Sequence, residues 1–444
     1  MTLLNKIYLI SLKDCSFIGR YYKKTVIFFR KHIATLWFSQ KKSPSYKSDN
    51  HNQHTSKKNI KTIKNKSRQI FMRIWTVTLF LFFIFPIYCI ENPLKVLHLS
   101  FHSAQIKEIE FLSKKFEFDL ITWNPLDNAP YEDGNIFFCP FDGYSRGNRL
   151  YNIGHCRAQL IWELHKNFFK QFDLIITSDT APLSRIFLQN NCTIPLMIWI
   201  CNRLDYTNTA SLDCEFPDAE LYALFRKACR KKHTQIFSCT PFEIAYAHKK
   251  NIKLKKFIIK PLGIPDEGLP KKPLTLNKIN REVSFFVLPY HNDKTLPKIL
   301  DALEISYYQG QYADLNDQKN FKGTIHIPHA WSSFTLFKNW SNEMIYFIPS
   351  KDFLKELSEQ IEFFWSPPLD WKELDYSEWY LPQHQNLFVY FDSWEDLKRK
   401  IIDTDYKNMK EKIKNFMHAH TEENLEKWEN VLKKAKEYKL TKQL

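Results

Sequence analysis

Short apolar runs alternate with amphipathic stretches through the part of the chain that follows residue 94. Lys95 to Phe101 has the apolar character of a buried strand, and Ser103 to Phe116, directly after it, carries apolar residues at helical spacing. Further runs expected to form strands lie at 118–123, 173–177, 195–201, 235–238 and 257–260. Strands that alternate with helices in this order predict βαβ units and hence a parallel sheet.

A second series of the same kind follows a stretch rich in proline and glycine at 261–273. Its expected strands lie at 283–288, 344–348, 361–365 and 387–391, and its expected helices include 296–307, 406–417 and 421–438. Clusters of proline and glycine are typical of the connections between domains. We therefore expect an α/β fold of two doubly wound, Rossmann-like parallel-sheet domains facing a cleft, with residues 92–268 in the first and 269–444 in the second.

Most of the net charge of +16 lies in the N-terminal tail. Residues 1–69 carry 16 Lys and Arg against Asp14 and Asp49, so residues 70–444 have a net charge of only +2. The tail from Gln40 to Arg68 has almost no apolar residues and is expected to be disordered. Because the basic charge lies in a tail and not on the body, the composition does not favour a nucleic-acid partner.

Residues 70–91 form a segment of their own. Ile74 to Ile90 is a run of 17 apolar or near-apolar residues without a charge, with Lys and Arg on its N-terminal side. This length is the lower limit for spanning a bilayer, and the charge asymmetry places the tail in the cytosol. Two interpretations stay open. One is a single-pass membrane anchor, and the other is a cleavable signal peptide starting at Met72 that would direct the body to the secretory pathway.

Several kinds of chemistry are excluded by missing motifs. The chain has nine glycines but neither a G-x-G-x-x-G sequence nor a Walker loop, which disfavours a dinucleotide oxidoreductase or a P-loop enzyme. Its nine cysteines include no C-x-x-C pair, and His326 and His329 have no carboxylate close in sequence. We therefore expect no bound metal.

Two loops of the first domain hold candidate residues for an acceptor. His155 lies in a glycine-containing polar loop, 142–157, that precedes a helix, although an ordinary surface loop fits this pattern equally well. Arg203 and Asp205 directly follow the apolar run PLMIWIC, so they project from the carboxyl end of a strand. They are either acceptor ligands or a salt bridge that fixes the loop. His102, just after the first strand, is a lesser candidate.

Residues 323–350 have the most distinctive pattern of the second domain. A short apolar run leads to a polar and aromatic cluster, followed by a helix from Phe334, a buried strand and another helix. Ser332 and Ser333 would stand at the helix N-terminus, where main-chain N–H groups favour a phosphate. Lys294, ahead of an earlier helix, is either a solvated lysine or faces the same phosphate-sized space, because helix starts share one edge of a doubly wound sheet.

This order of loop, helix, strand and helix resembles the donor side of GT-B type glycosyltransferases. The likeness is one of pattern and extends over about residues 95–440. It implies a nucleotide-sugar donor held by Lys294, His329, Trp331, Ser332, Ser333 and Lys338. Lys294 matches the family's diphosphate-binding lysine, whereas Pro289-Tyr290 stand where the family has Gly-Arg. The resemblance also implies a last helix that crosses back to the first domain.

The paired glutamates of that family fall at Ala330 and Lys338 in this chain, and both are lost. Asp370 and Glu378 have the same spacing and are candidates to replace them. The leading hypothesis is therefore transfer of a sugar from a nucleotide donor to a glycan, lipid or protein acceptor. Its candidate catalytic residues are His155, Arg203, Asp205 and Glu378. The alternative is a catalytically inactive GT-B-like binding protein at a membrane.

Overall fold

The computed structural model describes residues 93–100, 102–123, 153–205, 218–264, 284–287, 295–309, 321–328, 330–359 and 371–443. All of these residues belong to one compact unit, Asn92–Leu444. The tail and the apolar run at 74–90 lie outside the described residues. Among the residues that are described, no helix combines the length and the apolar character that crossing a bilayer requires.

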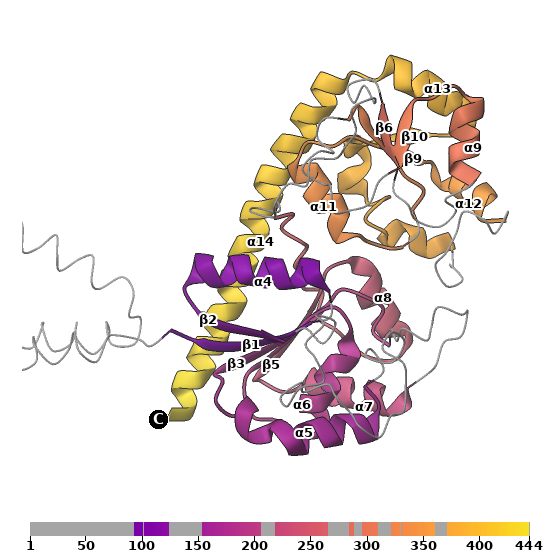
Figure 1. The fold of residues 1–444 in the computed structure, drawn as a ribbon. Coiled ribbons are helices and arrows are strands. Elements are labelled where there is room, and N and C mark those ends of the chain that lie inside the picture. Colours follow the sequence, from indigo (N-terminus) through magenta and orange to yellow (C-terminus); the bar gives the residue numbers. More distant parts are fainter. Residues whose placement is uncertain are drawn as a thin grey trace, which may run out of the picture. The chain divides into compact units, whose positions relative to one another are not determined.

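The first five strands form one parallel sheet in the order β2-β1-β3-β4-β5 (Figure 1). They are β1 Lys95–Leu99, β2 Asp119–Trp123, β3 Leu174–Thr177, β4 Leu196–Ile200 and β5 Thr234–Ser238. The helices between them are α4 Ser103–Phe116, α5 His155–Phe169, the 3₁₀ helix η1 Ala181–Ser184, α6 Arg185–Gln189, α7 Ala219–Ala228 and α8 Pro241–Lys249. We call the described residues from 93 to 264 the first half.

The next five strands form a second parallel sheet in the order β10-β9-β8-β6-β7. They are β6 Phe285–Val287, β7 Tyr307–Gln309, β8 Gly323–Ile325, β9 Tyr346–Pro349 and β10 Phe388–Phe391. The accompanying helices are α9 Thr295–Ala302, α11 Phe334–Ser341, α12 Lys351–Glu359, η4 Trp371–Tyr376, η5 Pro382–Leu387 and α13 Trp394–Asp403. We call the described residues from 284 to 405 the second half. The expected fold class, two doubly wound parallel sheets, is confirmed.

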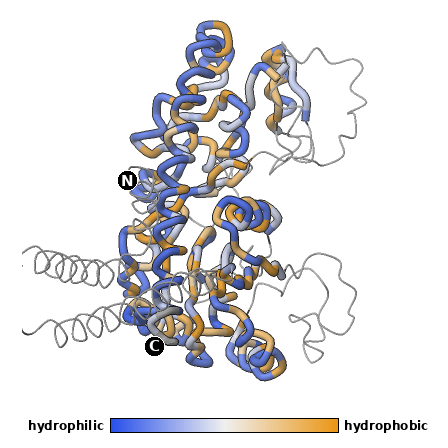
Figure 2. Tube along the Cα trace, turned by 90° about the vertical axis from the view of Figure 1, so that its left-hand side faces the viewer, coloured by the Kyte–Doolittle hydropathy of each residue, from blue (hydrophilic) through white to orange (hydrophobic). Residues whose placement is uncertain are grey.

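Apolar side chains on both faces of the central strands explain why the sheets are covered on two sides. All five residues of β4, LMIWI, are buried. Alternate residues feed two separate cores, with Ile198 on one face and Met197 and Trp199 on the other. Along the helices, hydrophilic and hydrophobic positions alternate, so that one side of each helix can pack on a sheet (Figure 2).

The last helix, α14 Tyr406–Gln443, packs against both halves (Figure 1). Its Ile413 and Met417 belong to the core of the second half. Its Trp428, Val431, Leu432 and Ala435 belong to a core of the first half. The chain therefore returns to the first sheet, as the resemblance implied. The two helices expected at 406–417 and 421–438 are one continuous helix.

Two other elements differ from expectation. The helix expected at 296–307 ends at Ala302, after which Glu304 has a left-handed φ of 58° and Tyr307–Gln309 form β7. The strand expected at 257–260 is reduced to a single bridge between Ser238 and Ile258. The strand expected at 361–365 and most of the proline- and glycine-rich connection lie outside the described residues, so the domain boundary stays a prediction.

Candidate functional site

Polar side chains gather where the strands of the first sheet end. His102 follows β1, Asp179 follows β3, Asn202 follows β4, and Thr240 follows β5. Parallel strands end at the same edge of a sheet, so these four positions share the carboxyl edge. The edge is therefore rich in groups that can accept or donate hydrogen bonds, and two of them, His102 and Asp179, are titratable.

Asp179 is the most unusual residue of this edge. Its side chain is buried, and its backbone has a left-handed φ of 72°, which costs energy for a residue other than glycine. One carboxylate oxygen accepts a hydrogen bond of 2.6 Å from the Asn202 side-chain amide. Among the described residues it has no cationic partner. Burial raises the pKa of Asp179 to about 7, although Asn202 opposes the shift, so this carboxyl can exchange a proton near neutral pH.

His102 lies on the neighbouring strand end and caps helix α4. Its Nδ1 accepts a hydrogen bond of 3.2 Å from the Ala104 N–H, so the neutral ring carries its proton on Nε2. Loss of surrounding water lowers the pKa of His102, which keeps the imidazole neutral at pH 7. In this form the ring offers an N–H to a bound group.

The start of helix α11 contacts the same edge from the second half. Phe334, its first residue, lies 6.2 Å from the His102 ring and 5.5 Å from the Trp199 ring, measured between centroids. Trp331 stacks on Phe242 of helix α8 with centroids 3.8 Å apart. The structure thus brings the 330–333 segment, which holds three of the predicted donor-binding residues, against the carboxyl edge of the first sheet.

Within the 330–333 segment the two serines have different surroundings. The Ser333 hydroxyl accepts a hydrogen bond of 3.2 Å from the Thr335 N–H and caps helix α11. The Ser332 hydroxyl oxygen is buried, and no hydrogen-bond partner is found for it in the described part of the chain.

Lys338 lies on α11 and is half-buried. Lys294 and His329 lie outside the described residues, so the shared phosphate space of Lys294 and Ser332 stays a prediction.

Arg203 and Asp205 form an ion pair, with 2.9 Å between Arg203 Nε and an Asp205 oxygen. The buried Asp205 carboxylate also accepts hydrogen bonds from the hydroxyls of Tyr222 and Tyr246. Three donors on one buried carboxylate leave it little capacity for a ligand. Of the two interpretations that the sequence left open, this arrangement favours the salt bridge that fixes the loop.

His155, at the start of helix α5, is tied to helix α7. Its Nδ1 lies 2.7 Å from a Glu220 oxygen, and both side chains are about half exposed. Glu220 and Asp218 also pair with the guanidinium of Arg185. These contacts join helices α5, α6 and α7, and they do not involve the 330–333 segment.

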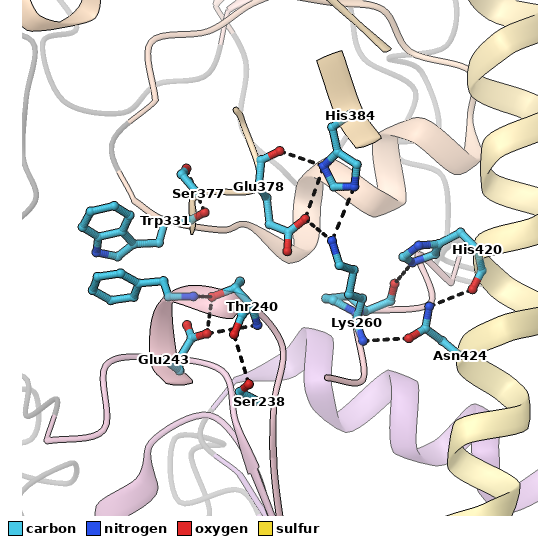
Figure 3. A network of polar contacts seen from close by, with 12 residues as sticks. Ser238, Thr240, Glu243, Lys260, Trp331, Ser377, Glu378, His384, His420 and Asn424 are labelled. Atoms are coloured by element: carbon cyan, nitrogen blue, oxygen red, sulfur yellow. Dashed lines mark hydrogen bonds and ion pairs between the residues drawn. The ribbon is translucent and has the colours of Figure 1, made fainter. Parts of the chain in front are cut away.

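Glu378 lies in a buried polar network that connects the two halves (Figure 3). Lys260 Nζ donates a 2.7 Å hydrogen bond to Glu378 Oε2 and lies 3.4 Å from His384 Nε2. His384 Nδ1–H donates to the Glu378 main-chain oxygen over 2.7 Å. Burial raises the pKa of Glu378 against the effect of Lys260, and it lowers the pKa of His384 to about 2. Glu378 is thus an inter-half ion-pair partner and not a solvent-facing carboxylate.

Sequence reasoning missed Asp179, Lys260 and His384. Asp179 had a detectable signal, because it follows the apolar run FDLIIT in the way that Asn202 follows PLMIWIC. Lys260 and His384 are 124 residues apart and have no local signal. Among the described residues, no group of three or more His, Cys, Asp and Glu side chains is arranged to hold a metal ion.

Comparison with solved structures finds glycosyltransferases at low sequence identity. SnogD, a glycosyltransferase from Streptomyces nogalater, is 11% identical with a TM-score of 0.42, over 73% of this chain and 95% of that one. CalG4, the calicheamicin glycosyltransferase, is 6% identical with a TM-score of 0.35, over 77% and 98%. The DNA modifying enzyme β-glucosyltransferase is 9% identical with a TM-score of 0.35, over 77% and 99%. No protein-family model matches the sequence, and no curated protein matches it significantly.

Proposed function

We propose that the protein is a glycosyltransferase that moves a sugar from a nucleotide diphosphate donor to an acceptor hydroxyl. The observation that carries this proposal is the contact between the start of helix α11 and the carboxyl edge of the first sheet. Phe334 reaches His102 and Trp199 there, and Trp331 reaches Phe242. A donor bound at the 330–333 segment would therefore have its sugar beside His102, at the carboxyl edge that also holds Asp179.

Sugar transfer makes two demands on such a site. The acceptor hydroxyl loses a proton as its oxygen bonds to the sugar carbon, and the bond from that carbon to the diphosphate breaks. The leaving diphosphate gains negative charge, which N–H groups and cations must stabilise. The N-terminal N–H groups of α11 suit the diphosphate, and Lys338 and Lys294 are the candidate cations.

Asp179 is the candidate base for the acceptor. Its pKa of about 7 lets it take a proton from a hydroxyl at neutral pH and release it afterwards. His102 would donate from Nε2 to an oxygen of the donor or the acceptor. Arg203 and Asp205 would support the loop next to Asn202, the residue that orients Asp179. In this proposal no step requires a metal.

Nucleotide binding is the first test. Titration of the full chain with uridine and guanosine diphosphates by calorimetry should detect one site, and incubation with the matching nucleotide sugars should release free diphosphate slowly. Ser332→Asp places a negative charge at the α11 start and should abolish binding. Ser358→Asp, near the end of α12 in the same half, is the control and should bind like the wild type. Absence of binding to either nucleotide would contradict the proposal.

A specific observation also supports a second candidate, a binding protein without transferase activity. The family's glutamate positions hold Ala330 and Lys338, and Glu378 is engaged in a buried ion pair with Lys260. None of these residues can take the role that the glutamates have. Tight nucleotide binding without hydrolysis or transfer, at any pH from 6 to 9, would favour this candidate.

A further inference from the structure

Residues 377–379 hold the main chain of the 330–333 segment in place. The Glu378 N–H donates a hydrogen bond of 2.9 Å to the Trp331 carbonyl oxygen, and the Ser377 hydroxyl donates to the same oxygen over 3.1 Å. The Trp379 indole N–H donates to the Ala330 carbonyl oxygen over 2.8 Å. Three hydrogen bonds therefore fix two successive carbonyl groups directly before Ser332.

The same short stretch is tied to the first half through the side chain of Glu378. Its carboxylate is fully buried and accepts a hydrogen bond from the ammonium group of Lys260, a residue at the end of the first half. Figure 3 shows Lys260 reaching Glu378 and His384 from below, while the Trp331 and Ser377 side chains lie on the other side of Glu378. One residue thus contacts the 330–333 segment through its N–H and the first half through its carboxylate.

The main chain at Lys260 and the two residues after it is held by three hydrogen bonds. Its N–H donates to the Asn424 side chain on α14 over 2.8 Å, and the next residue, Pro261, accepts a hydrogen bond of 2.8 Å from His420. The Leu262 N–H donates to the buried Glu108 carboxyl of α4 over 2.9 Å. The main chain that carries Lys260 is therefore tied to both α4 and α14.

We propose that Lys260 and Glu378 are positioning residues that make donor binding depend on contact between the two halves. This inference rests on the proposed function, because it concerns the same donor site. A buried carboxylate that loses its cation must move or take up a proton. Displacement of the side chain also shifts the Glu378 main chain, which removes its hydrogen bond to Trp331. The 330–333 segment is then ordered only while Lys260 is engaged, although Lys260 does not belong to the donor site.

The test compares Lys260→Met, Glu378→Gln and the double variant with Arg185→Met as control. Arg185 is also a buried cation with two carboxylate partners, but its contacts are confined to the first half. Two quantities are measured on folded full-length protein: hydrogen-exchange rates of the amides at 332–335, and the Kd for uridine diphosphate. The exchange rates do not depend on the nucleotide, so the coupling is tested even if no nucleotide binds.

We expect each single variant to exchange these amides about tenfold faster and to bind the nucleotide about tenfold more weakly. The double variant should match the single ones, because the two residues act as a unit. It also has no unpaired buried charge, so it keeps the test valid if a single variant fails to fold. Arg185→Met should lower Tm and change neither quantity.

Unchanged exchange rates and an unchanged Kd in the folded double variant would overturn the inference. Equal changes of both quantities in Arg185→Met would also overturn the inference, because they would indicate a general loss of stability and not a specific coupling. Faster exchange in the Lys260 and Glu378 variants of a protein that binds no nucleotide would support the coupling while contradicting the proposed function. The two failures are therefore distinguishable.

Discussion

At the scale of single residues, a buried carboxyl with a pKa of about 7 is the group whose chemistry is most open to test. Asp179→Asn keeps the size of the side chain and removes its ability to accept a proton. Transfer should fall by about 10²- to 10⁴-fold, while nucleotide binding and Tm at pH 6 change little. Initial rates with a nucleotide sugar and a hydroxyl acceptor measure the loss of transfer. Calorimetric Kd values show whether nucleotide binding is retained.

The pH dependence of the wild type follows from the same group. Asp179 accepts a proton only when it is ionised, so the rate should rise with pH through about 7 and then level off. A rate that is flat from pH 6 to 8 would argue against Asp179 as the base.

Glu108, buried on α4 against the Leu262 N–H, gives a stability prediction. Burial raises the pKa of Glu108 from 4.5 to about 8. Between these values the folded protein retains a proton that the unfolded chain releases, so wild-type stability should fall as pH rises through this window. Glu108→Gln keeps the acceptor for Leu262 and has no proton to lose. Its Tm should therefore exceed that of the wild type at pH 8 and equal it near pH 4.5.

Thermal unfolding followed by circular dichroism at the two pH values measures this difference. Glu110→Gln, at an exposed position of the same helix, is the matched control. A Tm advantage of Glu108→Gln that is the same at both pH values would show that the carboxyl does not titrate in this window.

Local patterns predicted individual site residues where a strand end or a helix start marks them, as at Ser333, the N-cap of α11. Arg203 and Asp205 were located correctly at the end of β4. The partners that engage Asp205, Tyr222 and Tyr246, come from helices α7 and α8, and no sequence pattern indicates which hydroxyls converge on it. For the same reason the pairing of Lys260 with Glu378, 118 residues further on, was beyond sequence reasoning.

At the scale of elements, Gly263 shows how closely helix α11 approaches the end of the first half. Its φ is 72°, and a Cβ built on it would lie 2.5 Å from the Phe337 carbonyl oxygen of α11. Gly263→Ala should therefore cost at least about 2 kcal/mol of unfolding free energy, from the left-handed backbone and the collision together. Urea denaturation measures this loss.

Gly154 is the control for that substitution. It precedes helix α5 with an ordinary φ of −72°, and no described atom lies within 4 Å of the position that an alanine Cβ would take there. Gly154→Ala should change the unfolding free energy by less than about 1 kcal/mol. Equal losses in the two variants would indicate that α11 does not press against Gly263.

The bounds of fully buried strands were predictable from the sequence, whereas those of strands at the edge of a sheet were less so. The buried run of β4 was recognised within one residue at each end, whereas β7, an edge strand with the half-buried residues YYQ, was not predicted, and the expected helix 296–307 extended to its first residue. Helix α14 was expected to break between 417 and 421. It is continuous there, and the buried His420 within this stretch contacts the Pro261 carbonyl oxygen.

At the scale of the whole molecule, α14 belongs to the cores of both halves, so we expect the two halves to unfold together. Trp428 is fully buried and lies 5.2 Å from the Trp199 ring and 5.3 Å from the Phe237 ring. Trp428→Ala should cost about 3–5 kcal/mol and separate the unfolding of the halves. Calorimetry should show one transition for the wild type and two for the variant. Two transitions in both proteins would mean that α14 does not couple them.

Membrane association through residues 70–91 is the remaining prediction at this scale. The full chain should sediment with membranes and resist alkaline extraction if Ile74–Ile90 is an anchor, since 17 apolar residues can span a bilayer. Replacing Leu81 and Phe83 by Lys should release it. If the segment is instead a cleaved signal, mass spectrometry should find a mature N-terminus after residue 90. A chain that shows neither behaviour would contradict a targeting role for this segment.

The position of Trp428 also affects how the protein is made. The first sheet leaves the ribosome early, yet one of its two cores includes Trp428, Val431 and Leu432. About 160 residues separate Ile264 from Trp428. At the usual rates of translation, their synthesis takes roughly 10 to 30 s. During that interval the apolar face around Trp199 and Phe237 lacks its partners from α14, so a chaperone that binds this face would act before α14 has been completed.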